Sequence, residues 1–246
     1  MLKELEDYSW FPGALRRRQL EFVGAVSVWT KLYKPLATVV DEMIVLNKSH
    51  ALQDICSGSG KPAVYVHQQL NAKIPMLLTD KFPAAAFKNE DGIAYSLNPV
   101  DVLQMQPIEN IVYTMFNAFH HFTPGQQKAF IKKMASQQAP FVIAEILQPG
   151  LLNVIKIIFT TTVIQLLTAP FVKPFSLARL FFTYIIPVNL FTVTYDGVVS
   201  VFRSKTVKQY SELIKDVSTQ SYHVSVHMIN NWKGDLVYIK GTPIHT

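Results

Sequence analysis

The sequence predicts an α/β fold in which a mostly parallel sheet is covered by helices on both faces. Between about residues 51 and 147, short apolar strands alternate with amphipathic segments. Alternation at this spacing is typical of parallel strands joined by right-handed helical crossovers. Of the 246 residues, 49% are hydrophobic and only 16% are charged, which suits the core of a globular domain and excludes a disordered chain.

Seven strands are expected, five of them in the alternating region. These five cover residues 51–55, 75–79, 93–97, 111–116 and 141–146. Two more follow near the C-terminus, at residues 222–229 and 236–241, and the turn joining them is expected at residues 231–235.

Helix start signals fall between these strands. Residues 123–126 (Thr-Pro-Gly-Gln) combine an N-cap, a first-turn proline and a capping-box glutamine, which predicts a helix to about Gln137. Thr206 and Gln209 repeat the capping-box pattern ahead of a helix to about Val217. A shorter helix is expected over residues 60–70, where the proline falls in the first turn.

Residues 148–204 depart from this pattern, because the chain there is strongly apolar. Between residues 148 and 195 the only charges are basic, namely Lys156, Lys173 and Arg179. Its two uncharged runs are each 16 residues long, shorter than the ~20 residues that a helix needs to cross a bilayer. Two interpretations stay open: a helical subdomain buried against the core, or a cap whose residues 151–195 contact lipid or a lipophilic substrate.

Charge and cysteine content limit the partners and the compartment. The net charge of +6 is compatible with an anionic ligand or a membrane surface, but the basic residues are scattered apart from Arg16-Arg17-Arg18, so no nucleic-acid partner is expected. Cys56 is the only cysteine, which excludes an intrachain disulfide and a thiolate-rich zinc site. The acidic N-terminus does not fit a secretory signal, and we expect a cytoplasmic protein. The alternative is a cytoplasmic protein that associates with a membrane.

Residues 52–62 (Leu-Gln-Asp-Ile-Cys-Ser-Gly-Ser-Gly-Lys-Pro) contain the most informative pattern, an apolar strand that ends in a glycine-rich turn and enters a helix. Such a turn lets a ligand approach the backbone and the free N–H groups of the helix start. A phosphate-binding P-loop is excluded, because Ile55 and Pro62 stand where that motif needs glycine and Ser or Thr. A dinucleotide fingerprint formed by Gly58, Gly60 and Ala63 stays open, although it lacks a third glycine.

The same segment resembles the first motif of the class I S-adenosylmethionine-dependent methyltransferases, acidic-x-Gly-x-Gly-x-Gly. Asp54 stands for the acid, Gly58 and Gly60 for the last two glycines, and Cys56 replaces the first glycine. The resemblance implies a Rossmann-like seven-stranded sheet with an antiparallel strand at its C-terminal end. It also implies S-adenosylmethionine as the cofactor, bound by a turn that includes Ser57 and Ser59.

Later strand ends extend this resemblance in the expected order. Asp80 ends the second strand, where a carboxylate can accept hydrogen bonds from both ribose hydroxyls. The resemblance places Asp101 and Val102 beside the adenine. The stretch from Phe116 to Phe122 (Phe-Asn-Ala-Phe-His-His-Phe) is similar to one at the end of the fourth strand of many small-molecule methyltransferases, which makes Phe116 and Asn117 cofactor candidates.

Candidate groups for the methyl acceptor come from three places. His120 and His121 are the candidate catalytic residues, because an imidazole at a strand end can accept a proton from a hydroxyl or an amine. Asp196 and Arg203 match an Asp-Gly-x-x-Ser stretch followed by Arg in similar methyltransferase-like sequences, and they are candidates for the acceptor pocket with Tyr33. Asp196-Gly197 reads either as a hairpin turn or as a helix N-cap.

A metal site is not expected. His223 and His227 have a spacing that would suit metal ligands on a helix, but they alternate with apolar residues as in a strand. Four residues of strand separate them by roughly 13 Å, too far to bind one zinc ion.

These interpretations give one methyltransferase-like domain over residues 1–246. It comprises an N-terminal helical lid (1–48), a cofactor-binding core (49–147), the apolar insert or cap (148–204), and a C-terminal helix with the strand pair (205–246). The expected activity is methyl transfer from S-adenosylmethionine to a small acceptor, lipophilic because the insert is rich in Phe, Ile and Leu. The alternatives are an NAD(P)-dependent oxidoreductase and a non-catalytic scaffold that binds a membrane or a partner protein.

Overall fold

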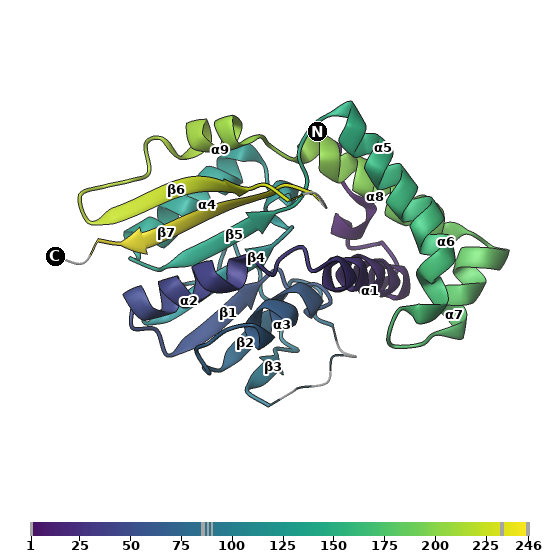
Figure 1. The fold of residues 1–246 in the computed structure, drawn as a ribbon, viewed down its shortest axis with the longest axis horizontal. Coiled ribbons are helices and arrows are strands. Elements are labelled where there is room, and N and C mark those ends of the chain that lie inside the picture. The colour runs from purple at the N-terminus through teal and green to yellow at the C-terminus, as the bar shows by residue number, and fades with distance from the viewer. Residues whose placement is uncertain (1, 85–86, 88, 90, 232–233, 245–246) are drawn as a thin grey trace.

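The computed structural model describes residues 2–84, 87, 89, 91–231 and 234–244. Its centre is a seven-stranded sheet with the order β3-β2-β1-β4-β5-β7-β6 (Figure 1). The strands are β1 (Ala51–Ile55), β2 (Met76–Thr79), β3 (Ile93–Tyr95), β4 (Ile111–Phe116), β5 (Phe141–Glu145), β6 (Tyr222–Ile229) and β7 (Leu236–Pro243). Strands β1 to β5 are parallel, and β7 lies antiparallel between β5 and β6. The predicted α/β class and its antiparallel end are confirmed.

The predicted strands agree closely with the observed ones. Three have the observed bounds, and the other four differ by one or two residues at an end. The turn predicted between the last two strands includes Trp232 and Lys233, which lie outside the described residues.

Helices cover both faces of the sheet. One face packs against α2 (Leu36–Leu46) and α3 (Lys61–Gln68), and the other against α4 (Pro124–Ser136) and α9 (Val207–Ile214). Successive strand residues point to opposite faces, so that Val112 and Val142 pack with the first pair of helices while Tyr113 and Phe141 pack with the second. This alternation explains why nearly every residue of β4 and β5 is apolar.

Both predicted capping boxes are present. Thr123 accepts a hydrogen bond from the Gln126 amide at 3.3 Å, and Thr206 accepts one from the Gln209 amide at 3.2 Å. The two helices begin where the sequence predicts. They end at Ser136 and Ile214, the second of them earlier than predicted.

The apolar insert forms a helical layer beyond one end of the sheet (Figure 1). It contains α5 (Leu151–Phe159), α6 (Gln165–Thr168), α7 (Leu177–Leu180) and α8 (Val188–Arg203), with π-helical turns at Thr160–Ile164 and Phe181–Ile185. Helix α1 (Gly13–Thr30) contacts both α8 and α3, so it connects this layer to the rest of the fold. The buried side chain of Arg179 pairs with Glu21 of α1 and donates to the Val172 carbonyl at 2.6 Å.

Much of the insert is exposed, although Val172 and Val193 are buried against α1. Helix α5 has no buried residue. Residues 151–171 form a helical segment long and apolar enough to cross a membrane, with a mean hydropathy of 1.7 and only 11% of its apolar window buried. The segments Leu177–Ile185 and Val188–Arg203 pass the same test as a pair but are bent by 82°.

Both interpretations of Asp196-Gly197 were wrong, because the pair lies in the middle of α8. The Asp196 carboxylate accepts from the amides of Leu5 and Glu6, at 2.6 and 3.1 Å, rather than from its own helix. A Cβ at Gly197 would lie 2.7 Å from a methyl group of Ile157, so the glycine allows α5 to approach α8 closely. Both residues therefore serve contacts between distant segments, which local turn signals do not reveal.

Candidate cofactor and acceptor cavity

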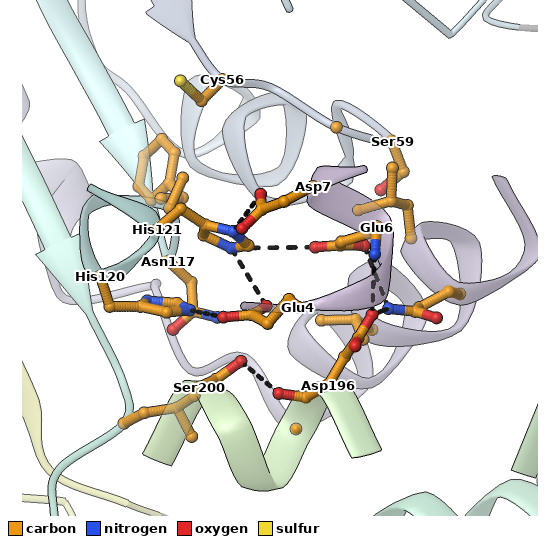
Figure 2. Close-up of a pocket in the computed structure, with 18 of the residues that line it drawn as sticks. Glu4, Glu6, Asp7, Cys56, Ser59, Asn117, His120, His121, Asp196 and Ser200 are labelled. Carbon is orange, nitrogen blue, oxygen red and sulfur yellow. Dashed lines mark hydrogen bonds and ion pairs between the residues drawn. The ribbon is translucent and has the colours of Figure 1, made fainter. Parts of the chain in front are cut away.

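A cavity of about 540 Å³ lies where the chain connections of β1 and β4 leave the sheet. The strand order reverses between these two neighbours, and ligands of open α/β sheets bind at the carboxyl ends of strands at such a point. The cavity is lined by the turns after β1, β2, β3 and β4, by α1, by residues of the N-terminal segment (2–7), by Ile157 of α5 and by residues of α8. Figure 2 shows several of these side chains around it.

The glycine turn after β1 lines the cavity with Cys56, Ser57, Gly58 and Ser59. Cys56 and Gly58 have φ values of 56° and 53°, so the cysteine adopts the left-handed conformation that glycine takes more readily. The Ser57 hydroxyl accepts from the Thr79 amide at 3.1 Å and fixes the turn to the end of β2. Burial, followed by the charge of Asp80, raises the pKa of the Cys56 thiol well above its usual value, so the thiol is protonated and unreactive at neutral pH.

Two residues of the predicted cofactor motif do not line this cavity. Asp54 is 1% exposed, and its carboxylate accepts from the Thr114 hydroxyl at 2.7 Å. Burial raises the pKa of Asp54 to about 7. Gly60 precedes α3 with a φ of 72°, and a Cβ there would lie 2.8 Å from Leu78. Asp54 therefore connects the end of β1 to β4 instead of reaching the cavity, and Gly60 allows the start of α3 to pack closely against β2.

Asp80 lies beside the glycine turn, as the sequence predicts. One carboxylate oxygen accepts from the Gly58 amide at 2.8 Å, and the other accepts from the Phe82 amide at 2.7 Å. Burial raises the pKa of Asp80, and these two amides act against the rise. Since a carboxylate has about four acceptor positions, Asp80 can still accept from two further donors in the cavity.

The remaining cofactor candidates also reach the cavity. Asp101 and Val102 line it after β3, where Asp101 accepts from the Leu103 amide at 3.1 Å and pairs with Lys81 at 3.3 Å. Phe116, the last residue of β4, and Asn117, directly after it, also line the cavity. Four connections between elements thus contribute predicted residues to one space.

His120 and His121 line the cavity beside Asn117 and the N-terminal segment, with Cys56 of the glycine turn on one side of them and Ser200 on the other (Figure 2). His120 is 1% exposed, and its Nδ1 is 2.6 Å from a carboxylate oxygen of Glu145. The other Glu145 oxygen accepts from the Phe119 amide at 2.6 Å. His121 is partly exposed, and its Nδ1 is 2.9 Å from Asp7.

The charge of His121 is set by its acidic neighbours. Burial acts to lower its pKa, but Glu4, Asp7 and Glu6 raise the pKa of His121 to about 10, so the imidazole is cationic at neutral pH. Burial, with further contributions from Glu4, Asp196 and Asp7, raises the pKa of Glu6 to about 8. His121 is therefore unsuited to accept a proton from a substrate.

The predicted acceptor-pocket residues all line the same cavity. Arg203 donates to the His120 carbonyl at 3.0 Å and to the carbonyl of His121, and pairs with Asp7 at 3.1 Å. The Asp196 carboxylate accepts a hydrogen bond from Nε2 of Gln19 at 2.5 Å. Tyr33 is 1% exposed and packs edge-on against Phe116, with ring centroids 5.1 Å apart.

Sequence reasoning missed the acidic N-terminal segment. Glu4, Glu6 and Asp7 line the cavity, and Glu4 is only 2% exposed. Arg16 lines it too, with its guanidinium 3.8 Å from the ring centroid of Phe82. No spacing rule relates these residues to the histidines. The useful signal is a run of acidic residues ahead of a helix in a chain that is basic overall.

Comparison with known proteins gives a match of fold. No protein-family model matches the chain, and no curated protein matches it. Human N-acetylserotonin methyltransferase, solved in complex with SAM, superposes with a TM-score of 0.53 at 12% identity over 91% of this chain. The plantazolicin methyltransferase BpumL, solved with a monoazolic desmethylPZN analog and SAH, gives a TM-score of 0.53 at 10% identity over 93% of this chain.

The two solved structures differ in the share of their own length that this chain covers. This chain spans 55% of the human enzyme and 87% of BpumL. The observed strand order, with β7 antiparallel next to β5, agrees with the sheet that the sequence resemblance implied. The chain therefore has the Rossmann-like fold of the class I S-adenosylmethionine-dependent methyltransferases.

Proposed function

We propose that this protein transfers a methyl group from S-adenosylmethionine to a small lipophilic acceptor. The observation that supports the proposal is the convergence of Gly58, Asp80 and Asp101 on one cavity, together with inner residues of the apolar insert. The volume of about 540 Å³ lies in the range of small-molecule sites.

The residues present suit this cofactor. Asp80 retains acceptor capacity for ribose hydroxyls. Gly58 tolerates its positive φ and leaves the turn free of a side chain. Asp101 and Val102 add one polar and one apolar group to the cavity lining after β3. The sulfonium of bound S-adenosylmethionine supplies an activated methyl group. What this chain contributes is the position and orientation of donor and acceptor, which can account for much of the rate.

The acceptor side is formed by different groups. Val193, Ile157 and Phe22 give the cavity an apolar wall near α8, while His120 and Arg203 give it polar groups. Nε2 of His120 has no hydrogen-bond partner among the described residues. Glu145 holds the ring through Nδ1, so His120 is the better candidate for contact with an acceptor hydroxyl or amine.

Calorimetry with S-adenosylhomocysteine and with NADH tests the proposal. We expect saturable binding of the first and none of the second, and the reverse would support the oxidoreductase. Asp80→Ala is expected to weaken S-adenosylhomocysteine binding about 10–100-fold, since a charged acceptor contributes roughly 1.5–3 kcal/mol. Asp235→Ala, at an exposed position, is the control. Unchanged affinity in Asp80→Ala would contradict the assignment.

The apolar insert supports a second proposal, peripheral contact with an anionic membrane. Of the 29 large hydrophobic side chains exposed among the described residues, 18 lie between Leu151 and Phe202. Lys156 and Lys173 are exposed there, and the sequence has no acidic residue between positions 148 and 195. An apolar face with only cations suits insertion beside anionic headgroups. It would bring the cavity near a source of lipophilic acceptors.

Co-sedimentation with vesicles tests the membrane proposal. We expect binding to phosphatidylglycerol vesicles, weaker binding to phosphatidylcholine, and loss of binding in the Leu152→Glu/Phe171→Glu double variant. Val45→Glu is the matched control, because Val45 is 74% exposed on α2 while Leu152 and Phe171 are 73% and 70% exposed. Equal binding by the double variant and the control would contradict the proposal.

A further inference from the structure

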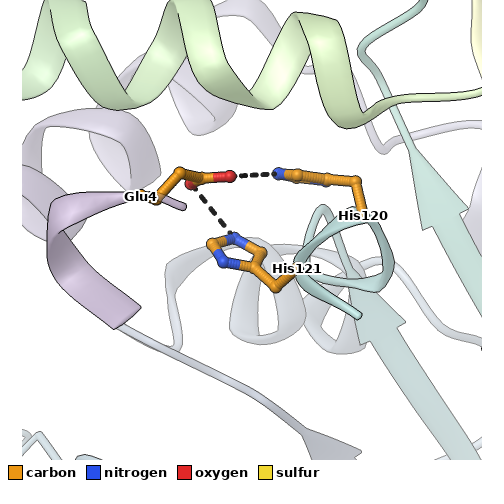
Figure 3. Close-up of side chains that lie close together, drawn as sticks. All are labelled: Glu4, His120 and His121. Carbon is orange, nitrogen blue, oxygen red and sulfur yellow. Dashed lines mark ion pairs between the residues drawn. The ribbon is translucent and has the colours of Figure 1, made fainter. Parts of the chain in front are cut away.

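Three metal-ligating side chains from distant parts of the chain meet in the cavity (Figure 3). Glu4 comes from the N-terminal segment, and His120 and His121 come from the turn after β4. Each offers a ligand atom, and these atoms lie within 4.8 Å of one another. Nε2 of His120 is 3.6 Å from one oxygen of Glu4, and Nε2 of His121 is 3.5 Å from the other.

Both imidazoles are held in the same way. Nδ1 of His120 is 2.6 Å from Glu145, and Nδ1 of His121 is 2.9 Å from Asp7. Each carboxylate therefore fixes the orientation of its ring and leaves Nε2 directed toward Glu4, as Figure 3 shows. Histidines that bind metals have this arrangement, with the outer nitrogen bonded to a carboxylate.

Buried polar atoms at the meeting point lack hydrogen-bond partners. Among the described residues, Nε2 of His120 and Oε1 of Glu4 accept and donate no hydrogen bond, although the two residues are 1% and 2% exposed. Leaving such atoms unsatisfied in a buried site is costly. The surroundings are rich in carboxylates, since Glu6, Asp7, Glu145 and Asp196 lie around the same point. Two cations already lie among them: His121, and Arg203 with its Nη1 3.9 Å from Glu4 and 3.1 Å from Asp7. Carboxyl groups remain in excess, so the cluster favours a further cation.

We propose that Glu4, Nε2 of His120 and Nε2 of His121 bind one divalent transition-metal ion of the zinc type. The ion would take the place of the Nε2 proton of the cationic His121, and that proton would be released to solvent. Neighbouring ligands of a tetrahedral ion with bonds of about 2.0–2.1 Å lie roughly 3.3–3.4 Å apart. The observed 3.5 and 3.6 Å join the two imidazoles to different oxygens of Glu4, and the three ligand atoms lie within 4.8 Å of one another, so binding requires the three side chains to close on the ion. Two imidazoles and one carboxylate leave a fourth position open. All three ligands line the cavity, so that position faces it.

This metal site goes beyond methyl transfer and does not depend on it. An ion on Nε2 of His120 occupies the nitrogen that a proton acceptor would need. It would instead polarise an acceptor oxygen that reaches the open position. The expectation of no metal site rested on His223 and His227, and the sequence separation of Glu4 from the histidine pair hides the alternative.

Metal titration of chelator-treated protein, without a histidine tag, tests the proposal. We expect one Zn²⁺ per chain by calorimetry, and a visible Co²⁺ spectrum in the wild type that Zn²⁺ displaces. Glu4→Gln and His121→Gln should abolish this binding, whereas Asp7→Asn and Glu145→Gln should weaken it about 10–100-fold. His223→Gln, at an exposed histidine outside the cavity lining, is the control and should bind as the wild type does.

Two outcomes would overturn the proposal: wild-type protein that binds neither Zn²⁺ nor Co²⁺ saturably, or binding that Glu4→Gln and His121→Gln both leave unchanged. The wild-type Co²⁺ spectrum decides the question even if a ligand variant fails to fold, which circular dichroism detects. Each titration is repeated with S-adenosylhomocysteine. If that compound does not bind but Zn²⁺ does, the methyl-donor assignment fails and the metal site stands.

Discussion

The two sides of the cavity are built in opposite ways. On the glycine-turn side, Gly58 and Asp80 belong to neighbouring strand ends and are held by backbone amides. On the histidine side, Glu4, His120 and Arg203 come from three distant segments, and their buried polar groups lie 3.6 to 3.9 Å from one another at Glu4. The position of the glycine turn is fixed by the register of the sheet. The positions of the groups on the histidine side depend on contacts between segments far apart in the sequence.

This difference predicts how strongly a substitution on each side affects the stability of the protein. Amides at a strand end are ordered whenever the sheet forms, so the glycine turn depends on local conformation. A buried charge that loses its partner costs several kcal/mol, so each residue of the histidine side depends on the others. The largest mutational effects on stability are therefore expected on the histidine side.

Arg203→Met should have the largest effect on stability. It removes the donors to the His120 and His121 carbonyls and leaves Asp7 without its arginine. We expect a loss of about 3–5 kcal/mol in the free energy of unfolding, measured by urea denaturation. Arg17→Met is the control, because Arg17 is half exposed and 3.9 Å from Glu21, and should cost less than about 1 kcal/mol. Similar losses in the two variants would contradict the comparison.

The glycine-turn side could be predicted from the sequence because its signals are local. Strand ends, capping boxes and the spacing from Gly58 to Asp80 all depend on neighbouring residues or on one crossover. Of the predicted cofactor residues, only Asp54 and Gly60 lie outside the cavity lining. Both contact neighbouring strands of the sheet, Asp54 through Thr114 and Gly60 beside Leu78. Their roles, and those of the other predicted site residues, remain predictions.

The histidine side could be predicted only in part. His120, His121 and Arg203 were expected near an acceptor, but Glu4 and Glu145, which contact the histidines, gave no signal. A buried carboxylate is recognisable only once its partner is known, and that partner lies far along the chain. The insert was expected to be helical, but the position of Asp196 in the middle of a helix was missed, because its partners are amides of the distant N-terminal segment.

Asp54→Asn tests the glycine-turn side through pH. Burial raises the pKa of Asp54 in the folded protein to about 7, above its ordinary value of 3.8, so folding favours the protonated form. Wild-type stability should therefore fall as pH rises from about 4 to 7, where the unfolded chain has already released the proton. Asparagine is always neutral, and its side-chain oxygen can still accept from Thr114.

We expect Asp54→Asn to be more stable than the wild type by roughly 2–4 kcal/mol at pH 8, and about equally stable at pH 4. Urea denaturation at both pH values measures this difference. Asp216→Asn, at a surface carboxylate paired with Lys128, is the control and should give no gain at pH 8. A gain that is independent of pH would show that Asp54 is ionised in the folded protein.

Gly58→Ala should have the smallest effect on stability and a clear effect on binding. The left-handed conformation at φ 53° costs a residue with a side chain about 1–2 kcal/mol, and the new Cβ would lie 3.2 Å from Leu20. Gly125→Ala is the matched control, because Gly125 lies in the first turn of α4 with nothing within 4 Å of a Cβ, and should stabilise by about 0.5–1 kcal/mol. S-adenosylhomocysteine affinity, measured by calorimetry, should fall only in Gly58→Ala. Gly58→Ala keeps the amide that donates to Asp80, so a loss of affinity without unfolding would show that the ligand depends on the conformation of this turn or on the space beside it. Equal affinity in both variants would separate the glycine turn from the ligand site.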